Sequence, residues 1–206
     1  DDTRDWGIRI GETETTYYYA FNRNKRSVAL DLADPAMIEA ARALVADADV
    51  VVENFKQGGM ERFGLGFEDL LKINPRIIYC SIAGYDRAGE EAKRSGYDLV
   101  VQGESGLMAI NGEAGRPPLK FGVAVVDMFT GMYAAQAILA ALVQVQRTGR
   151  GRRVDLSLYD CGVTLSAYYG LDALVMKSDP PRYGNAHPSI VPYGVFDAAD
   201  GPLVIA

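Results

Sequence analysis

Three short stretches place polar or turn-forming residues directly after apolar runs of the chain. They are Asn54-Phe55, Gly84-Tyr85 and Asp127. If the apolar runs are strands of an open α/β sheet, ligands bind outside the carboxyl ends of these strands, so these residues are the first candidates for a site.

Asp127 is the best placed of these residues for catalysis. An apolar segment, residues 123–126, precedes it, and a long helical pattern at residues 128–146 follows. The dipole at a helix start stabilises a negative charge, and a carboxylate held there can act as a nucleophile. The spacing alone favours a simpler role, in which Asp127 caps that helix as aspartate often does. The residues by themselves do not separate the two roles.

Other kinds of catalytic site find little support in the sequence. His187 is the only histidine, so a Ser-His-Asp triad, a Cys-His pair or a histidine-based metal site would have to use it, and it stands in a loop beside Pro188. No C-x-x-C motif, Walker glycine loop or G-x-G-x-x-G motif follows an apolar run. We therefore expect no metal site and no nucleotide-binding loop.

The charge of the chain restricts its partners. A formal net charge of −6 gives no general attraction for nucleic acid or an anionic membrane, so a phosphate-bearing ligand would need a local basic cluster. Residues 22–27 hold three cations and suit either a phosphate site or a solvated loop. Residues 147–153 hold four arginines at the end of a helical pattern, where cations complement the helix dipole. We expect neither a nucleic-acid nor a membrane partner.

Alternating helical and strand patterns would position the candidate residues. Asp34 and Pro35 indicate a helix start, and Asn74-Pro75 a helix end. The patterns predict helices at residues 35–45, 67–73, 128–146 and 160–176, and strands at 50–52, 77–82 and 154–158. This order predicts the α/β class, with an open Rossmann-like sheet and flanking helices. The linker-like residues 178–181 suggest a large domain at 1–178 and the start of a smaller domain with a strand pair at 179–206.

The bulk composition is that of a globular protein. With 206 residues and 49% hydrophobic content, the chain can bury a core. Cys80 and Cys161 lie in separate apolar segments, which indicates two buried thiols in a reducing compartment. No apolar run approaches the ~20 residues of a membrane span. We expect a cytoplasmic or organelle-matrix protein.

Six strings resemble, in order and spacing, the large domain of family III CoA-transferases, the CaiB/BaiF family that includes formyl-CoA transferase. They are NKRSVALDL at 24–32, ADVVVENF at 48–55, NPRIIY at 74–79, GYD at 96–98, DMFTG at 127–131 and TGRGRRVD at 148–155. The resemblance spans the whole chain and implies a fragment that lacks both ends of a family member. One departure is visible at Lys56-Gln57-Gly58, where the family often has proline before the glycine.

The resemblance implies roles for individual residues. Asp127 matches the catalytic aspartate of the family, and Leu30, Asn54, Phe55 and Arg62 match positions along the groove that receives coenzyme A. Arg94 lies close to the position where the family has a basic residue that helps to bind the phosphates of coenzyme A. Amides near Met128 and in residues 183–189 would meet the oxyanion. No permanently bound cofactor is implied, and coenzyme A enters as part of an acyl-CoA substrate.

The implied reaction transfers coenzyme A from an acyl-CoA to a small carboxylic acid. Asp127, in a pocket that keeps water out, would form an aspartyl mixed anhydride and then an aspartyl-CoA thioester. One alternative is an α-methylacyl-CoA racemase-like enzyme, but those relatives have histidine where this chain has Tyr97, and a phenol is a poor base at neutral pH. Another is a CoA-binding fragment without catalysis. The resemblance also implies an interlocked homodimer for the full-length protein.

Overall fold

The computed structural model describes residues 1–206 and divides into two compact units, Asp1–Ile38 and Glu39–Ala206. The first unit contains the 3-10 helix η1 (Asp2–Asp5) and helix α1 (Thr16–Asn22). Thr15 caps α1 because its hydroxyl accepts a hydrogen bond from the Tyr18 amide at 3.1 Å. Leu30 is half-buried in an irregular, largely exposed segment of this unit.

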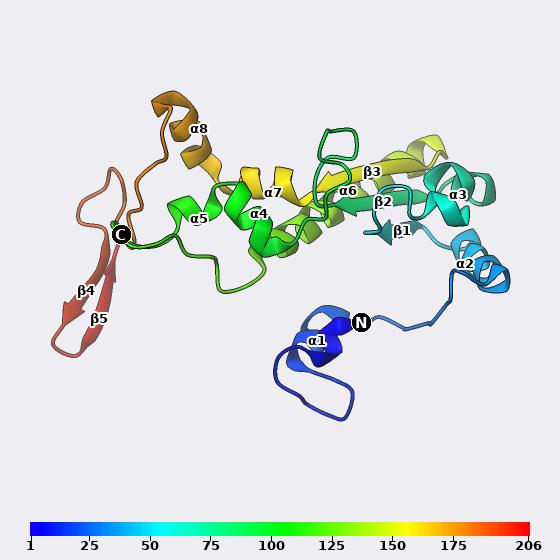
Figure 1. Ribbon diagram of the computed structural model, residues 1–206, viewed down its shortest axis with the longest axis horizontal. Helices are drawn as coiled ribbons and strands as arrows, with labels where there is room; N and C mark the ends of the chain where they lie inside the picture. The colour runs from blue at the N-terminus through cyan, green and yellow to red at the C-terminus, as the bar shows by residue number, and fades with distance from the viewer. The chain divides into compact units, whose positions relative to one another are not determined.

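The second unit contains a three-stranded parallel sheet, which lies beside α3 (Phe67–Ile73) and α6 (Val125–Thr148) (Figure 1). Strands β1 (Val50–Glu53), β2 (Ile78–Ala83) and β3 (Arg152–Ser157) lie in the order β1-β2-β3. The central strand β2 begins with four buried residues, as expected for a parallel strand covered on both faces. Because parallel strands end at the same edge, Glu53 and Ser81 are register partners at the carboxyl edge of the sheet.

Helices connect the strands in the predicted α/β order. Helix α2 (Pro35–Ala46) precedes β1, and η2 (Glu61–Phe63) with α3 (Phe67–Ile73) leads to β2. Helices α4 (Asp98–Glu104), α5 (Leu107–Ile110) and α6 (Val125–Thr148) lie between β2 and β3. The expected cap of α2 is confirmed, since the Asp34 carboxylate accepts from the Ala36 amide at 2.8 Å. Helices α4 and α5 were not predicted, because their few apolar residues show no clear period.

Helix α6 is the main helix packed on the sheet. Near its carboxyl end, Ala141 and Val145 form a buried cluster with Ile78 of β2. Near its amino end, Val126 packs with Val101 and Leu107 in a second buried cluster. Each fully buried aliphatic side chain contributes about 1.5–3 kcal/mol. These two clusters fix the start of α6 relative to the end of β2.

By length and composition, α6 is also the one helix that would suffice to cross a membrane. The expectation that no apolar run approaches this length was therefore wrong, because residues 125–148 are apolar on average despite a few isolated polar residues. Length and composition alone are weak evidence for a span, and the core helix of a globular fold passes the same test. One face of α6 packs on β2 and β3, although most residues of this helix are exposed or only partly buried in this chain.

The carboxyl-terminal part contains helices α7 (Leu158–Leu165) and α8 (Ala167–Met176), then the hairpin of β4 (Gly194–Ala198) and β5 (Gly201–Ile205). The prediction of one helix at residues 160–176 was wrong in continuity. The chain breaks at Ser166, whose hydroxyl donates to the Val163 carbonyl oxygen at 2.7 Å, and Ala167 follows with φ at +48°. The predicted strand pair is confirmed. The domain boundary expected near Asp179 stays a prediction.

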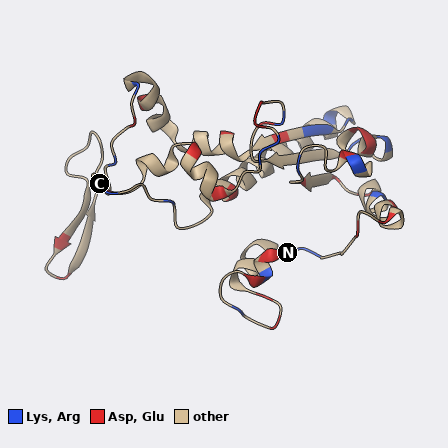
Figure 2. Cartoon of the chain, in the orientation of Figure 1, with Lys and Arg blue, Asp and Glu red and all other residues tan.

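Lys and Arg residues gather where α6 ends and β3 begins (Figure 2). Arg152 donates to the Gln144 side chain at 2.6 Å, and Arg153 pairs with Asp155 at 2.9 Å. This cluster lies at the amino end of β3, so the parallel sheet separates it from the carboxyl edge. Cys80 and Cys161 are free, buried thiols as expected.

Candidate active site

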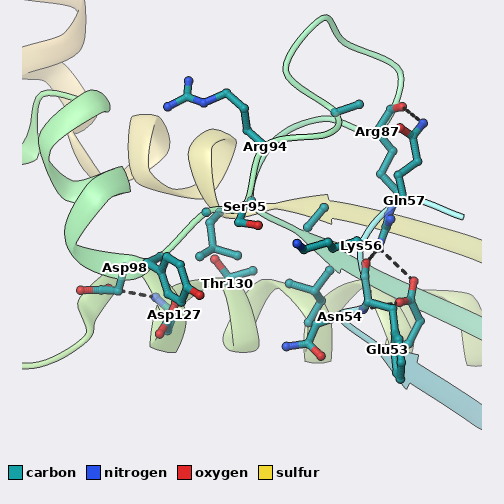
Figure 3. Close-up of a pocket in the computed structure, with 18 of the residues that line it drawn as sticks. Glu53, Asn54, Lys56, Gln57, Arg87, Arg94, Ser95, Asp98, Asp127 and Thr130 are labelled. Atoms are coloured by element: carbon teal, nitrogen blue, oxygen red, sulfur yellow. Dashed lines mark hydrogen bonds and ion pairs between the residues drawn. The ribbon is translucent and has the colours of Figure 1, made fainter. Parts of the chain in front are cut away.

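A groove of about 860 Å³ opens at the carboxyl edge of the sheet, where the sequence placed the candidate residues. This volume falls in the range of sites for small-molecule ligands. Its walls come from the residues after β1, the residues after β2, the segment that leads into α4, and the first turns of α6. In Figure 3, Asp98 and Asp127 lie together at one end of the groove, and Glu53 and Asn54 at the other.

Asp127 does not cap a helix. Helix α6 begins at Val125, so Asp127 already lies in its first turn, and the carboxylate of Asp98 provides the cap instead. Asp98 Oδ1 accepts from the amides of Val126 at 2.8 Å and Asp127 at 3.3 Å. The capping role is thereby excluded, and the structure gives the carboxylate of Asp127 no hydrogen-bond partner. The side chain is left available for chemistry.

The surroundings of Asp127 favour protonation more than water does. The residue is exposed toward the groove, yet the atoms packed around its carboxyl group remove part of its hydration. This burial, and then the negative charge of Asp98, raise the pKa of Asp127 to about 6. An ionised carboxylate with a raised pKa is a better nucleophile than an ordinary one. The expected water-excluding pocket is instead an open groove, so a bound substrate has to displace the water itself.

A backbone crossing shapes the groove beside Asp98. The loop of residues 85–95 leaves β2 at Gly84 and returns at Gly96, where the two glycines lie against each other. A Cβ atom on Gly84 would lie only 2.5 Å from the Cα of Gly96. The Gly84 carbonyl also accepts from the Tyr159 amide at 3.0 Å. Only glycine at both positions permits this approach, which brings the loop and Asp98 back to the sheet edge.

The expected oxyanion donors are not free in this structure. The amide of Met128 donates to the Ala124 carbonyl at 3.0 Å within α6, and the two preceding amides are bound by Asp98. Residues 183–189 do not line the groove. The Met128 amide is already bonded because the helix starts three residues earlier than its apolar pattern indicated. The identity of the oxyanion donors stays a prediction. The Asn54 side chain can also donate hydrogen bonds, but it lies at the end of the groove opposite Asp127 (Figure 3).

A model of CoA-transferase family III matches residues 1–206. The chain belongs to CoA-transferase family III. Succinate–glutarate CoA-transferase of Agrobacterium fabrum is 45% identical over 212 residues, which cover 100% of this chain and 53% of that protein. Succinyl-CoA:glutarate CoA-transferase of Homo sapiens is 43% identical over 205 residues, which cover 100% and 47%. The chain thus spans about half the length of these curated relatives.

A solved structure confirms the fold of this family III chain. A CaiB/BaiF family protein from Brucella suis is 45% identical and superposes with a TM-score of 0.91. The match covers 100% of this chain and 56% of that one. The parallel sheet with flanking helices is therefore a part of a larger family III protein.

The groove brings together four of the six residues that the family resemblance singled out. Asn54, Phe55, Arg94 and Asp127 line it. Arg62 does not: it is exposed, and its guanidinium group lies over the Phe63 ring at 4.4 Å. Leu30 belongs to the first unit. Their binding and catalytic roles stay predictions.

Arg94 is a less available cation than its position suggests. Its guanidinium group pairs with Glu104 at 2.6 Å and with Glu91 at 3.1 Å, and it lies over the Tyr85 ring. Two other groove cations, Lys56 and Lys93, have no ion-pair partner. Neither lysine was predicted from the sequence as a binding residue. Lys56 had a usable signal, since it directly follows the Asn54-Phe55 pair.

Proposed function

We propose that the full-length protein transfers coenzyme A from an acyl-CoA to a small carboxylic acid, with Asp127 as the nucleophile. One observation carries the proposal: the carboxylate of Asp127 has no partner, and it faces a groove large enough for a small-molecule ligand. Family membership supports the reaction class. The names of the relatives cited above, with succinate and glutarate as acids, favour a small dicarboxylic acid as acceptor.

The reaction conserves the energy of the thioester in four steps. An oxygen atom of Asp127 attacks the acyl-CoA carbonyl carbon, the C–S bond breaks, and a mixed anhydride and CoA thiolate form. The thiolate attacks the aspartyl carbonyl carbon and releases the donor acid, which leaves an aspartyl-CoA thioester. The acceptor carboxylate attacks this thioester, which gives a second anhydride and thiolate. The thiolate then takes the acceptor acyl group and frees Asp127.

The experiment that tests this function traps the intermediates. We expect hydroxylamine to convert Asp127 to a hydroxamate in the full-length protein during incubation with succinyl-CoA, and peptide mass spectrometry locates the change. Without acyl-CoA, no residue should be modified. Deuterium exchange at the α-carbon of the acyl group without modification of Asp127 would favour the racemase-like alternative. Binding of coenzyme A with neither reaction would favour a non-catalytic CoA-binding protein.

The raised pKa of Asp127 predicts an acid limit for the reaction. Only the ionised carboxylate attacks, so we expect kcat/KM to fall about tenfold per pH unit below pH about 6. Asp98→Asn removes the second cause of the shift while its amide oxygen can still accept from the α6 amides, so this variant should move the limit to lower pH. Asp69→Asn, in the first turn of α3 and outside the groove, should not. A limit unchanged by Asp98→Asn would contradict the pairing of the two carboxylates.

The same shift has a defined effect on stability. A raised pKa means that the folded protein binds this proton more tightly than the unfolded chain does. The contribution of Asp127 to the free energy of unfolding is therefore fully present below its ordinary value of about 3.9, and it is lost as the pH rises through about 6. Neutral Asp127 is the stable form, and ionised Asp127 is the reactive one.

We also propose that the protein is a homodimer, interlocked as the family resemblance implies. Large apolar side chains remain exposed on two helices of the second unit, and they support the proposal. They include Met132, Leu139 and Val143 of α6 and Leu171, Leu174 and Val175 of α8. Sedimentation of the full-length protein tests this proposal, and a monomer at micromolar concentration would contradict it. The cytoplasmic location stays a prediction.

A further inference from the structure

A buried ion pair lies next to Asn54 and Phe55 in the wall of the groove. Glu53, the last residue of β1, is only 8% exposed. Its Oε2 accepts from the Phe55 amide at 2.7 Å, and its Oε1 accepts from Arg87 Nη2 at 3.1 Å. The hydroxyl of Ser81, its register partner on β2, also donates to Oε1. The carboxylate thus binds the segment that follows its own strand, the neighbouring strand and a distant loop.

Arg87 holds the other side of this arrangement. The same Nη2 that contacts Glu53 also donates to the Phe55 carbonyl oxygen at 3.0 Å. The Arg87 carbonyl in turn accepts from the Gln57 side chain at 3.1 Å. Residues 53–57 and the loop of residues 85–95 are therefore joined by one guanidinium group and one carboxylate (Figure 3).

The ion pair of Glu53 and Arg87 joins two loops, but its burial carries a large desolvation free energy. Both side chains lie largely out of water, at 12% and 6% exposed, and the desolvation of two charges offsets much of their attraction. The Arg87 Nε is also buried without a partner. Well-packed apolar residues would stabilise the fold as well or better. The hydrogen bonds of Glu53 and Arg87 are directional, so they fix the position of the Phe55 backbone.

We propose that Arg87, acting through Glu53, is a positioning residue that sets the shape of the CoA-binding wall at residues 54–57. The inference rests on the proposed function, since it assumes that this wall receives coenzyme A. Arg87 borders the groove, but its guanidinium group is committed to Glu53 and Phe55. Its effect on the ligand is therefore exerted through the backbone of the Asn54-Phe55-Lys56 segment.

The test compares Arg87→Met with Arg87→Lys in the full-length protein. Loss of the cation lets the wall shift, so we expect the Kd of coenzyme A, measured by calorimetry, to rise about tenfold in Arg87→Met. The KM for succinyl-CoA should rise in parallel with kcat little changed, because uniform binding is lost. Arg87→Lys should recover part of the affinity. Glu53→Gln combined with Arg87→Met should cost less than the sum of the single changes.

The chain offers a matched control in Arg42. Its guanidinium group also joins a carboxylate, that of Glu39 at 2.7 Å, to a backbone carbonyl, that of Gly64 at 3.3 Å, but it lies outside the groove. Arg42→Met should leave CoA binding unchanged. An equal loss of CoA affinity in both Met variants, or no loss in Arg87→Met, would overturn the inference.

The outcomes separate this inference from the proposed function. Unmodified Asp127 in the hydroxylamine experiment, with a raised Kd in Arg87→Met, would refute the transferase and keep the positioning role. Modified Asp127, with an unchanged Kd in Arg87→Met, would do the reverse. If Arg87→Met does not fold, the comparison of Arg87→Lys with the unaltered protein decides in the same way.

Discussion

Replacing Asp127 with alanine is expected to abolish CoA transfer and to leave the fold intact. No anhydride can form without the carboxylate, so kcat/KM should fall by at least about 10⁴-fold. The fold should tolerate the change because Asp98 caps the backbone amides of α6 and not the side chain of Asp127. Alanine is also the best helix former, and the change removes a carboxylate whose ionised form the folded state disfavours. Turnover and urea unfolding at pH 7 measure the two effects.

The controls distinguish loss of the nucleophile from loss of structure. Asp127→Asn keeps the shape of the side chain and should be as inactive as the alanine variant. Asp69→Ala removes an aspartate from the first turn of α3, outside the groove, and should retain full turnover. Measurable transfer by Asp127→Ala, or a large loss of stability, would refute the assigned role.

Replacing Gly84 with alanine is expected to cause the largest loss of stability among single methyl additions at the groove. The new Cβ would meet the backbone of Gly96 at 2.5 Å, and a backbone cannot rotate away as a side chain can. The two segments must separate, at a cost of about 3 kcal/mol in the free energy of unfolding. The groove should widen as Asp98 moves with the returning loop, so CoA affinity should fall as well. Urea unfolding and calorimetry measure both.

Gly89 provides the comparison on the same loop. A Cβ there would lie 3.4 Å from the Asp86 carbonyl oxygen, close to ordinary contact, and its backbone needs no positive φ. Gly89→Ala should therefore change stability by less than about 1 kcal/mol. Equal effects of the two substitutions would show that the crossing at Gly84 does not shape the groove.

Much of the fold follows from local patterns. The helix at residues 67–73 was predicted with its correct bounds, because Gly66 and Asn74 mark its ends. The three sheet strands were predicted from unbroken or alternating apolar runs, within two residues of their observed bounds. Since parallel strands end at one edge, the place of the groove followed from the strands. The role of Asp127 needed the family resemblance.

What remained hidden depends on contacts between distant residues. Asp98 caps a helix that begins 27 residues later. No local sequence pattern could therefore indicate that Asp127 does not cap this helix. Arg87 meets Glu53 across 34 positions, and neither residue belongs to a recognisable motif. The crossing of Gly84 and Gly96 likewise exists only once the loop has closed.

Because Asp98 caps α6, the start of this helix does not depend on the side chain of Asp127. Asp98 accepts hydrogen bonds only from main-chain amides of α6. The residue at position 127 can therefore be replaced without changing the rest of this helix. A cysteine at that position would present a thiol to the same groove, where thiol–thioester exchange replaces anhydride formation. Different nucleophilic side chains can therefore be compared at position 127 while the backbone of α6 stays the same.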